Sequence, residues 1–428
     1  MSSPLNLQQW LAKLEHISPN NIDLGLSRCQ IILDRLEFNK QWPLISVAGT
    51  NGKGSCVAML ESILVASGYQ VASYTSPHIF QFNERIKINS KEVDDDLICE
   101  AFEKIEAIRQ EILLTYFEYT TLASMIIFDQ MPLDVVIMEV GLGGRLDAVN
   151  VLDADVAIVT SIGLDHQDWL GSTREQIAIE KAGICRQEKP CVIAEADSPA
   201  SLIKTVADVN AKLYQNNNQY CYEILESCWS WECAELQLNY KDIPLPNLNG
   251  DVQVQNAAAV LMSLQLLKQI KVTEEQIFAG LQNIKISARF EVFNIEGKEV
   301  IVDVAHNAEA VFELNEMLMQ RQVVGDDFAL FGALMDKNIA SIYQSIKQTI
   351  NHWSVVSIKN ERGCDSGHIK KVFDGVGCLD ELSLFEDVEE ALNKTLKKMK
   401  NNDRLIVFGS FYLVADVLKL LKNRLYFN

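Results

Sequence analysis

The stretch LISVAGTNGKGS, residues 44–55, decides the fold of this chain. Its apolar first five residues predict a buried strand, the glycine-rich middle predicts a tight loop, and residues 55–66 predict an amphipathic helix. A strand, a glycine loop and a helix in this order form a phosphate cradle, because backbone N–H groups and the positive helix N-terminus face the anion. Lys53 adds a mobile positive charge to this cradle. The stretch therefore predicts an α/β protein that binds a phosphate group.

The spacing within this loop differs from the common Walker A pattern. That pattern places Ser or Thr directly after the lysine, whereas here Gly54 separates Lys53 from Ser55, and Val47 stands at the position of the first glycine. The alternative is a glycine-rich turn between strand and helix with an incidental lysine. Three glycines, a lysine and a hydroxyl at one junction favour the phosphate loop.

Bulk properties narrow the class of protein. The chain has 428 residues, enough for two or three domains, with 48% hydrophobic and 22% charged residues. Its net charge of −20 argues against nucleic acid or an anionic membrane as a partner. The ten cysteines show no paired C-x-x-C spacing, which favours reduced thiols in a reducing compartment. We find no signal-peptide pattern and no apolar run long enough for a membrane span, so we expect a cytoplasmic protein.

Along the chain, apolar strand patterns alternate with helical patterns, which predicts parallel sheets covered on both faces. Residues 219–246 instead alternate aromatic and polar residues, which predicts antiparallel strands. We expect two domains: residues 1–288, a P-loop-type domain with a mostly parallel sheet, and residues 289–428, a smaller Rossmann-like α/β domain. The expected strands are 44–48, 71–74, 135–140, 155–161, 191–194, 290–295, 300–304, 328–331, 353–357 and 405–408, and the main expected helices are 5–14, 55–66, 94–109, 119–130, 175–182, 256–269, 308–320, 339–349 and 412–421.

Polar residues gather just after the carboxyl ends of four expected strands: Lys53, Ser76, Glu139 and the pair Asp165-His166. Ligands of open parallel sheets bind at this edge. A carboxylate closing an apolar strand is costly to bury unless it meets a cation, and Mg²⁺ needs few protein oxygens beside nucleotide phosphates. Imidazole suits Mg²⁺ poorly. Each residue alone could be an ordinary polar loop residue, but their shared position favours a site.

Several segments, in order along the chain, resemble the folylpolyglutamate synthase/dihydrofolate synthase family of Mur-ligase-like ATP-dependent amide ligases. The resemblance covers nearly the whole chain. It is carried by GTNGKGS at 49–55, TSPH at 75–78, EVGLGGRLD at 139–147, Ser161 with Asp165-His166, EKAG at 180–183 and DVAHN at 303–307.

The resemblance implies roles for individual residues toward ATP and Mg²⁺. Lys53, Lys181 and His306 would be catalytic, and Lys181 would be carbamylated. Ser76, Glu139 and His166 would be the Mg²⁺ ligands. The nucleotide would be bound by Gly49, Thr50, Asn51, Gly52, Lys53, Gly54, Ser55, Asn256 at the adenine end, Arg289 at the phosphates and Asp303 at the ribose. For Lys181, a solvated helix lysine is the alternative.

The resemblance also implies a pterin site. Its residues would be Asp23, Leu24, Gly25, Leu26, Thr115, Tyr116, Phe117, Glu118, Leu146, Asp147 and Ala148. Without the resemblance, Tyr116 and Phe117 would be taken as core aromatics. The chain departs from the family where Ile286-Ser287-Ala288 replaces a usual Pro-Gly turn before Arg289.

The implied reaction is ATP-dependent ligation of L-glutamate to dihydropteroate and to the γ-carboxylate of reduced folates, through an acyl phosphate. The alternatives are a folylpolyglutamate synthase alone, a peptidoglycan-precursor ligase and a non-catalytic nucleotide-binding module. The second of these would carry a nucleotide-sugar domain ahead of the phosphate loop, where 48 residues stand here. The expected partners are small molecules only, with no nucleic acid and no membrane, and the chain is expected to act as a monomer.

Overall fold

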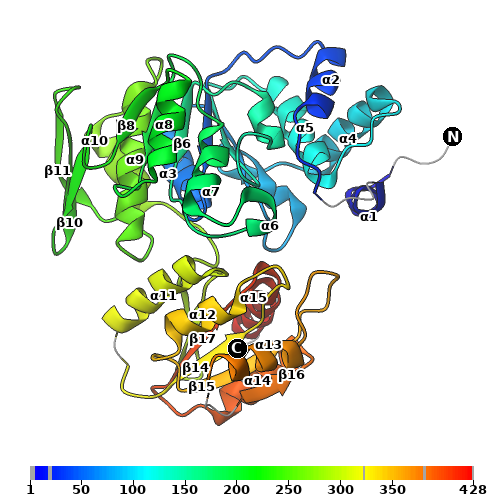
Figure 1. The fold of residues 1–428 in the computed structure, drawn as a ribbon, viewed down its shortest axis with the longest axis vertical. Helices are drawn as coiled ribbons and strands as arrows, with labels where there is room; N and C mark the ends of the chain where they lie inside the picture. Colours follow the sequence, from blue (N-terminus) through cyan, green and yellow to red (C-terminus); the bar gives the residue numbers. More distant parts are fainter. Residues whose placement is uncertain (1–4, 18–21, 322, 379–381, 427–428) are drawn as a thin grey trace. The chain divides into compact units, whose positions relative to one another are not determined.

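The computed structural model describes residues 5–17, 22–321, 323–378 and 382–426 and divides into two compact units (Figure 1). Unit 1 comprises Met1–Gly163, Leu170–Asn247 and Asp251–Ile284. Unit 2 comprises Leu164–Trp169, Leu248–Gly250 and Lys285–Asn428. The domain boundary at residue 288 stays a prediction.

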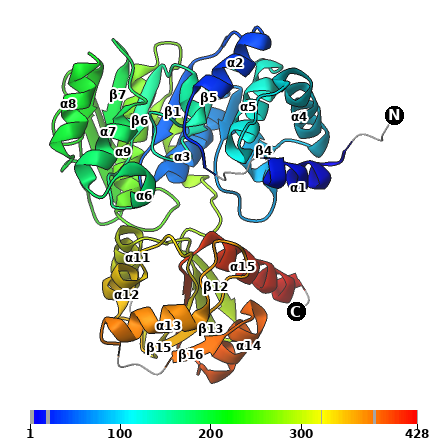
Figure 2. The same cartoon turned by 45° about the vertical axis from the view of Figure 1, so that its right-hand side comes forward.

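Unit 1 is built on a mostly parallel sheet with the strand order β4-β3-β2-β5-β1-β6-β7-β8. The central strands β5, β1, β6 and β7 stand side by side in Figure 2. Strand β1 is buried along its whole length, which fits its apolar sequence. The strands are β1 (Leu44–Ala48), β2 (Val71–Tyr74), β3 (Ile86–Ile88), β4 (Lys91–Glu92), β5 (Val135–Glu139), β6 (Val156–Val159), β7 (Pro190–Ile193) and β8 (Lys212–Gln215).

Helices cover both faces of this sheet. Helices α3 and α9 pack on one face, while α5, α7 and α8 share a core with the other. The helices of unit 1 are α1 (Leu7–Ile17), α2 (Ser27–Arg35), α3 (Lys53–Ala66), α4 (Asp95–Arg109), α5 (Tyr116–Asp129), α7 (Arg174–Ala182), α8 (Ala200–Asp208), α9 (Val252–Leu266) and α10 (Glu274–Gln282), with short 3₁₀ turns η1 (Phe82–Arg85) and η2 (Ala148–Val151).

Strands β9 (Cys221–Ile224), β10 (Cys228–Cys233) and β11 (Leu238–Pro244) form a separate antiparallel sheet in unit 1. Trp229 and Trp231 on β10 are buried. The antiparallel strands expected from the alternating aromatic and polar residues are therefore confirmed.

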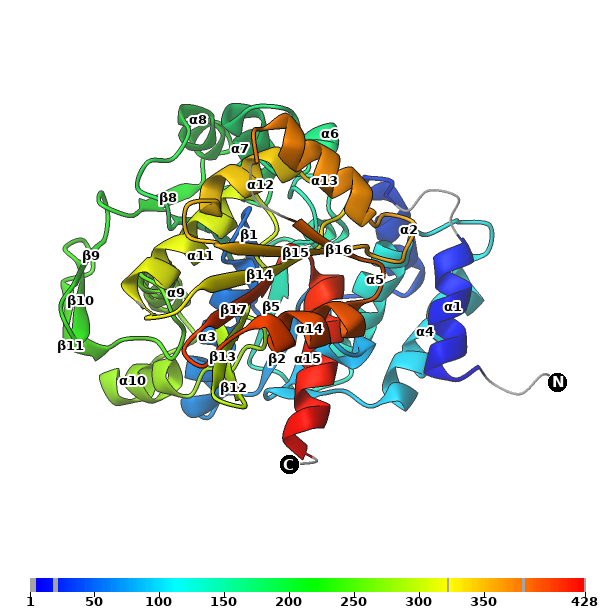
Figure 3. The same ribbon diagram turned by 90° about the horizontal axis from the view of Figure 1, so that it is seen from below.

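Unit 2 is a second α/β layer structure with the strand order β12-β13-β17-β14-β15-β16. Helices α11, α12 and α13 pack in a core on one face, and α14 and α15 contact the sheet on the other (Figure 3). Only β12 runs antiparallel to its neighbour among these described strands. The elements are β12 (Glu291–Ile295), β13 (Lys298–Val302), α11 (Ala308–Gln320), β14 (Asp327–Phe331), α12 (Ile339–Ile346), β15 (His352–Val356), α13 (Ser366–Gly375), β16 (Leu382–Phe385), α14 (Val388–Lys398), β17 (Arg404–Phe408) and α15 (Phe411–Tyr426), together with the short α6 (Gln167–Leu170), most of which falls in this unit.

The predicted fold class is confirmed, with a mostly parallel sheet in the larger unit and a smaller α/β unit after it. Among the described helices, none has both the length and the apolar sequence needed to cross a bilayer.

Candidate active site

The glycines at 49 and 52 shape the phosphate loop between β1 and α3. Gly49 has φ of +152°, and a Cβ there would lie 1.8 Å from Thr160 Oγ1. Gly52 has φ of +84° in the left-handed region and precedes the first helical residue, Lys53. Side chains are therefore excluded from both positions, which lets the chain turn sharply into the helix.

The residues that follow β6 brace this loop. Thr50 N donates to Ser161 O at 2.8 Å, and Asn51 N donates to Ser161 Oγ at 3.1 Å. Thr160 Oγ1 donates to Asn51 O at 2.5 Å. The first N–H groups of an α-helix lack acceptors within the helix, so the start of α3 supplies donors and a positive dipole for an anion.

Two lysines lie at the start of the loop. Lys53 Nζ donates to Gly49 O at 3.0 Å and to Thr50 O at 3.2 Å. Lys181, on α7, donates from Nζ to the same Gly49 O at 2.8 Å and is only 4% exposed. Lys181 is therefore a buried lysine of α7 that contacts the phosphate loop, and not a solvated helix lysine.

Tight backbone packing fixes α7 and hence Lys181. A Cβ on Gly144 would lie 2.7 Å from Glu180 O, and Arg145 N donates to that oxygen at 2.8 Å. A Cβ on Gly183 would lie 2.4 Å from Arg145 Cβ. The glycine-rich segment after β5 thus lets two backbones meet at a distance that larger residues would prevent.

Four neighbouring parallel strands of unit 1, in the order β2-β5-β1-β6, point their carboxyl ends to one edge of the sheet. Ser76 follows β2, Glu139 ends β5 and Lys53 follows β1, as the sequence predicted. His166 lies in the segment Leu164–Trp169, which belongs to unit 2.

Ser76 and Glu139, the predicted Mg²⁺ ligands of unit 1, are neighbours. Ser76 N donates to Glu139 Oε2 at 3.2 Å, and Glu139 is 6% exposed. Within the described residues no group of three or more His, Cys, Asp or Glu is arranged to hold a metal ion. A buried carboxylate next to a serine residue fits Mg²⁺ that takes its remaining ligands from phosphate and water. Their role as ligands stays a prediction.

Asn256, predicted at the adenine end, lies against the phosphate loop. It is 2% exposed on α9, and a Cβ on Gly52 would lie 2.7 Å from its Oδ1. Its Nδ2 donates to Gln253 Oε1 at 3.3 Å. The side chain therefore supports the turn into α3, and adenine contact stays a prediction.

The three segments predicted to bind the pterin come together in unit 1. Gly25 N donates to Leu146 O at 3.1 Å, which joins residues 23–26 to residues 146–148. The 3₁₀ turn η2, which begins at Ala148, contacts both α2 and α5. Leu24 and Leu26 are partly buried, and Asp23 is exposed.

Arg28 is the residue that joins these segments, and the sequence did not single it out. Its Nε lies 2.9 Å from Glu118 Oε1, and its Nη1 lies 3.0 Å from Asp23 Oδ2. Glu118 also accepts Thr115 N at 2.8 Å, and Thr115 Oγ1 accepts Glu118 N, in a capping box at the start of α5. Burial raises the pKa of Glu118, although these hydrogen bonds and Arg28 oppose the shift. Glu118 therefore positions Thr115 and Arg28 through its carboxylate.

The aromatic residues of this segment occupy the first turn of α5. Phe117 packs closely over Gly141: a Cβ on Gly141 would lie 2.4 Å from the Phe117 ring. The ring centroids of Phe117 and Tyr74 are 6.2 Å apart. Tyr116 and Phe117 are only partly buried. Both pack against the core and keep part of their surface exposed, and contact with a pterin stays a prediction.

Asp147 is buried at 2% exposure and caps η2. Its Oδ2 accepts Leu142 N at 2.8 Å, and its Oδ1 accepts Val149 N at 2.9 Å. Burial raises the pKa of Asp147 to about 7, against the opposing effect of these N–H groups and of the Lys53 charge. Asp147 N donates to Gly144 O at 3.1 Å, Gly144 packs against the backbone of Lys181, and Lys181 Nζ donates to Gly49 O. These contacts connect the phosphate loop to the predicted pterin segments.

In unit 2, Asp303 holds the turn that follows β13. Its Oδ2 accepts Phe290 N and its Oδ1 accepts Ala305 N, both at 2.7 Å. Burial raises its pKa, with the Arg289 charge opposing. The Arg289 guanidinium lies 5.9 Å from the Phe411 ring centroid. Contacts of Asp303 and Arg289 with nucleotide stay predictions.

The turn around Arg289 is strained where the chain lacks the Pro-Gly turn that the resemblance predicts. Ala288 has φ of +61° and Phe290 has φ of +46°, values that non-glycine residues seldom adopt. Ala288 N donates to Glu291 Oε2 at 2.8 Å, which helps to hold the turn. Glycine, which the resemblance predicts in this turn, would adopt a positive φ without strain.

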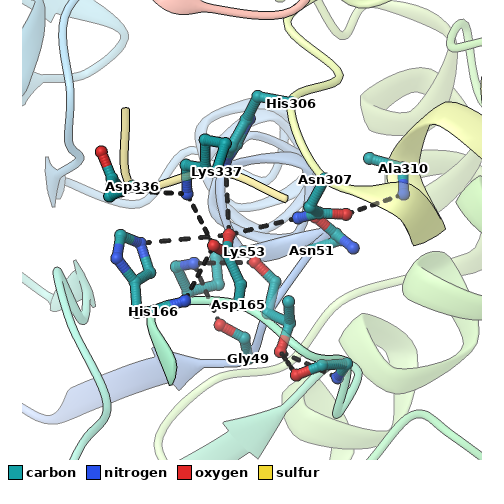
Figure 4. A network of polar contacts seen from close by, with 12 residues as sticks. Gly49, Asn51, Lys53, Asp165, His166, His306, Asn307, Ala310, Asp336 and Lys337 are labelled. Atoms are coloured by element: carbon teal, nitrogen blue, oxygen red, sulfur yellow. Dashed lines mark hydrogen bonds and ion pairs between the residues drawn. The ribbon is translucent and has the colours of Figure 1, made fainter. Parts of the chain in front are cut away.

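Asp165 contacts three cationic or polar side chains of unit 2 (Figure 4). Its Oδ1 lies 2.6 Å from Lys337 Nζ, and its Oδ2 lies 3.5 Å from His306 Nε2 and 3.3 Å from Asn307 Nδ2. Burial alone would raise the pKa of Asp165, but the His306 hydrogen bond and the Lys337 charge hold it well below its usual range. Its neighbour His166 donates a backbone N–H to Oδ1 at 2.8 Å. Asp165 therefore fixes the predicted residues His306 and His166, and the sequence missed Lys337.

Comparisons with known proteins agree with this architecture. Residues 47–264 match the Mur ligase middle domain, and residues 288–411 match the Mur ligase glutamate ligase domain. The chain is 38% identical to the dihydrofolate synthase/folylpolyglutamate synthase of Escherichia coli, over 98% of this chain and 96% of that protein. It is 32% identical to the Bacillus subtilis protein of the same name, over 93% and 95%.

Solved structures are similar over almost the same length. E. coli FolC in complex with DHPP and ADP has a TM-score of 0.92 at 37% identity, covering 98% of both chains. A bifunctional folylpolyglutamate synthase/dihydrofolate synthase with Mn, AMPPNP and L-glutamate bound has a TM-score of 0.90 at 37% identity, with the same coverage. By sequence and by structure, the chain belongs to the dihydrofolate synthase/folylpolyglutamate synthase family of Mur ligases.

Proposed function

We propose that this chain joins L-glutamate to dihydropteroate and to the γ-carboxylate of reduced folates, at the expense of ATP. The observation that carries the proposal is the meeting of a phosphate loop and the predicted pterin segments within unit 1. Lys181 joins the loop to the segment before Asp147, through its bond to Gly49 O and its packing against Gly144, and Gly25 is hydrogen-bonded to Leu146. Family relatives that bind ADP, DHPP and L-glutamate support the same reaction.

The chemistry follows from the difficulty of forming an amide in water. A carboxylate is a poor electrophile, so its oxygen first attacks the γ-phosphorus of ATP, which gives an acyl phosphate and ADP. The glutamate amine then attacks the acyl carbon, loses a proton, and phosphate leaves. The protein needs to hold phosphates and to align two substrates, and it needs no serine or cysteine nucleophile.

Different residues of unit 1 would carry out these two tasks. Lys53 and the start of α3 would stabilise charge on the transferring phosphoryl group. Ser76 and Glu139 would hold Mg²⁺, which supplies positive charge to the phosphates when bound. Lys181 beside Gly49 would, once carbamylated, place a negative group near that ion. Arg28 and Glu118 would keep the pterin segments in position.

Both acceptor reactions can be tested with the wild-type chain. ADP release is measured with ATP, L-glutamate and either dihydropteroate or tetrahydrofolate, and we expect turnover with each. Turnover of tetrahydrofolate alone would reduce the chain to a folylpolyglutamate synthase. Nucleotide binding without acceptor-dependent ADP release would favour a non-catalytic module.

Asp147 offers a sharper test of the dihydropteroate reaction. Asp147→Ala should lower kcat/KM for dihydropteroate more than for tetrahydrofolate, because the shorter acceptor depends more on its pterin contacts. The ratio of the two values is the readout, since losing the η2 cap would affect both. Asp208→Ala, which removes an exposed carboxylate paired with Lys204, is the matched control. An unchanged ratio of the two kcat/KM values would show that Asp147 does not belong to the pterin site.

We also propose that the chain acts as a monomer, since its phosphate loop and pterin segments belong to one unit of one chain. Light scattering after size exclusion should give a mass near 48.1 kDa. A mass of twice that value at working concentration would contradict this.

A further inference from the structure

Two cysteine side chains meet in the core of unit 1, and neither belongs to the candidate active site. Cys185 lies in the turn after α7, and Cys191 is the second residue of β7. Both are reduced thiols in the structure, and their Sγ atoms lie 2.8 Å apart. An S–S bond is about 2.0 Å long, so a small movement of these two side chains would bring the sulfurs to bonding distance.

The backbone holds both cysteines in place. Cys191 lies in the parallel ladder between β6 and β8. Cys185 N donates to Ala182 O at 3.0 Å, and Arg186 Nη1 donates to the carbonyl oxygens of Gly183 and Cys185 at 3.1 and 3.2 Å. The two thiols are therefore kept adjacent, which makes a reaction between them effectively unimolecular.

The surroundings of the pair leave little other chemistry to it. Both residues belong to the hydrophobic core of unit 1. They are not part of a group of three or more His, Cys, Asp or Glu that could hold a metal ion within the described residues. The hydrogen bond with Cys185 and burial both raise the pKa of the Cys191 thiol, which therefore keeps its proton at neutral pH. Oxidation of the two thiols to a disulfide needs only each other and an oxidant.

We propose that a peroxide oxidises Cys185 and Cys191 to a reversible disulfide between the end of α7 and β7. Cys185, at 4% exposure against 0% for Cys191, meets the oxidant first. Its thiolate attacks one oxygen of hydrogen peroxide, the O–O bond breaks, and a sulfenic acid and one water form. The Cys191 sulfur then attacks the Cys185 sulfur, its proton is lost, and the hydroxyl group leaves as a second water. Two thiols lose two electrons and two protons, and hydrogen peroxide is reduced to two waters.

The second thiol determines what oxidation does to this part of the core. A sulfenic acid without a nearby thiol proceeds to sulfinic acid, which dithiothreitol does not reverse. Cys191 instead diverts Cys185 to a disulfide that a thiol reductant can open. The same bond fastens the turn that ends α7, the helix of Lys181, to a strand in the interior of the sheet. The pair therefore makes oxidation reversible and restrains α7 while it lasts.

Peptide mapping tests the bond in the wild-type chain. The native protein is treated with hydrogen peroxide, unfolded with iodoacetamide present, and digested with trypsin without reductant. Cleavage after Arg186 places the two cysteines in separate peptides, 182–186 and 187–204. We expect these peptides to be joined, with the mass of the pair lower by two hydrogen atoms, and dithiothreitol to separate them. Oxidation of Cys99 and Cys228, which are partly exposed, reports that the dose was sufficient.

Three alanine variants separate the roles of the thiols. Cys191→Ala should accumulate sulfinic acid at Cys185, and dithiothreitol should not remove it. Cys185→Ala should leave the fully buried Cys191 unoxidised at the same dose. Cys233→Ala removes another buried thiol of unit 1, on β10, and should still give the joined peptides. If a variant does not fold, the mapping of wild type still decides.

Thermal unfolding tests the restraint on α7. The oxidised wild type should unfold at a temperature higher by about 2 °C or more, because the bond constrains the unfolded chain, and dithiothreitol should reverse the rise. Cys191→Ala treated alike should show no rise. A joined pair with an unchanged unfolding temperature would refute the restraint.

Three mapping results would overturn the disulfide. They are separate peptides at a dose that oxidises Cys99, a bond that forms only after unfolding in urea, and a bond of Cys185 or Cys191 mainly to another cysteine. These measurements need no turnover, so failure of the proposed ligase function would not affect them.

Discussion

Lys53 and Lys181 donate to the same carbonyl oxygen, that of Gly49, at 3.0 and 2.8 Å. They come from different helices, α3 and α7, and one of them is almost fully buried. Two amines at one oxygen favour loss of a proton from one of them, since like charges disfavour each other. A neutral amine is the form that reacts with CO₂, so this arrangement supports carbamylation of Lys181.

Lys53→Ala should abolish ligation while the fold is kept. The change removes a charge that the transition state needs and that the hydrophobic core does not, and we expect kcat to fall by about 10²–10³ or more. ADP release measures the loss, and circular dichroism with thermal unfolding checks the fold. Near-normal turnover would mean that the phosphate-loop assignment is wrong.

Lys181 should carry a carbamate that ¹³C-labelled bicarbonate makes visible. We expect a carbamate carbon signal by NMR in wild type and its loss in Lys181→Gln. Removal of CO₂ should lower activity, and bicarbonate should restore it. Lys189→Gln, which alters a lysine paired with Asp155, should keep the signal. A signal that persists in Lys181→Gln would point to another lysine.

Arg28→Met should weaken binding of both acceptors and leave the KM of ATP unchanged. The variant removes the cation that pairs with Glu118, which is 3% exposed, and the ion pair that holds Asp23. We expect KM for dihydropteroate and tetrahydrofolate to rise by about tenfold, equivalent to about 1.4 kcal/mol. Adding Glu118→Gln should cost less in the Arg28→Met background than in wild type, because the two residues act as a pair. Strict additivity of the two changes would show that they act separately.

Much of the fold could be predicted because the strands are short, apolar and bounded by glycines. The bounds of β1, β2 and α11 agree with the sequence prediction to the residue. Helix α5 begins at Tyr116 and not at 119, although the Thr115-x-x-Glu118 capping box carried the signal. Strand pair β3–β4, helices α8, α10, α13 and α14, and strands β8 and β16 were not predicted, since short or strongly polar elements depend on packing more than on local pattern.

The site was predictable where its residues share a local motif and missed where they meet across the chain. The phosphate loop is continuous in sequence, and the resemblance supplied Lys181. Arg28 meets Glu118 over a separation of 90 residues, and Lys337 meets Asp165 over 172. Neither arginine nor lysine stands in a distinctive pattern, so only the folded structure reveals these partners.

Asp147 should make stability depend on pH. Its pKa is raised by burial from the ordinary 3.8 to about 7, so between these values the folded chain holds a proton that the unfolded chain releases. Its contribution to the free energy of unfolding therefore falls as pH rises from about 4 to 7 and is constant above, by at most about 4 kcal/mol. Urea unfolding at pH 5 and pH 8 should show that wild type loses more stability than Asp147→Asn. Equal losses in the two proteins would contradict the shift.

Arg404→Met should destabilise unit 2. Arg404 is 2% exposed and binds Asp327 through two nitrogens, at 2.7 and 2.8 Å. Removing one partner of a buried pair costs about 3–5 kcal/mol. Hydrogen exchange of the amides in β14 and β17 should accelerate accordingly. Arg321→Met, which breaks an exposed ion pair, should change the free energy of unfolding obtained from this exchange by about 1 kcal/mol or less. Amide protection in β14 and β17 that stays at the wild-type level would show that the Arg404–Asp327 pair contributes little to the stability of unit 2.

The bonds from Thr50 and Asn51 to Ser161 mean that the phosphate loop loses its conformational entropy during folding and not when nucleotide arrives. Nucleotide affinity at this loop should then be governed by contacts with the phosphates, with little ordering of the chain to oppose it. Ser161→Ala would remove the hydroxyl that accepts Asn51 N and keep the carbonyl that accepts Thr50 N. Part of the entropic cost would then pass to the binding step, and it should appear as a less favourable binding entropy in calorimetry. The residues after β6, which need not touch the nucleotide, would in this way contribute to its affinity by keeping the loop ordered in advance.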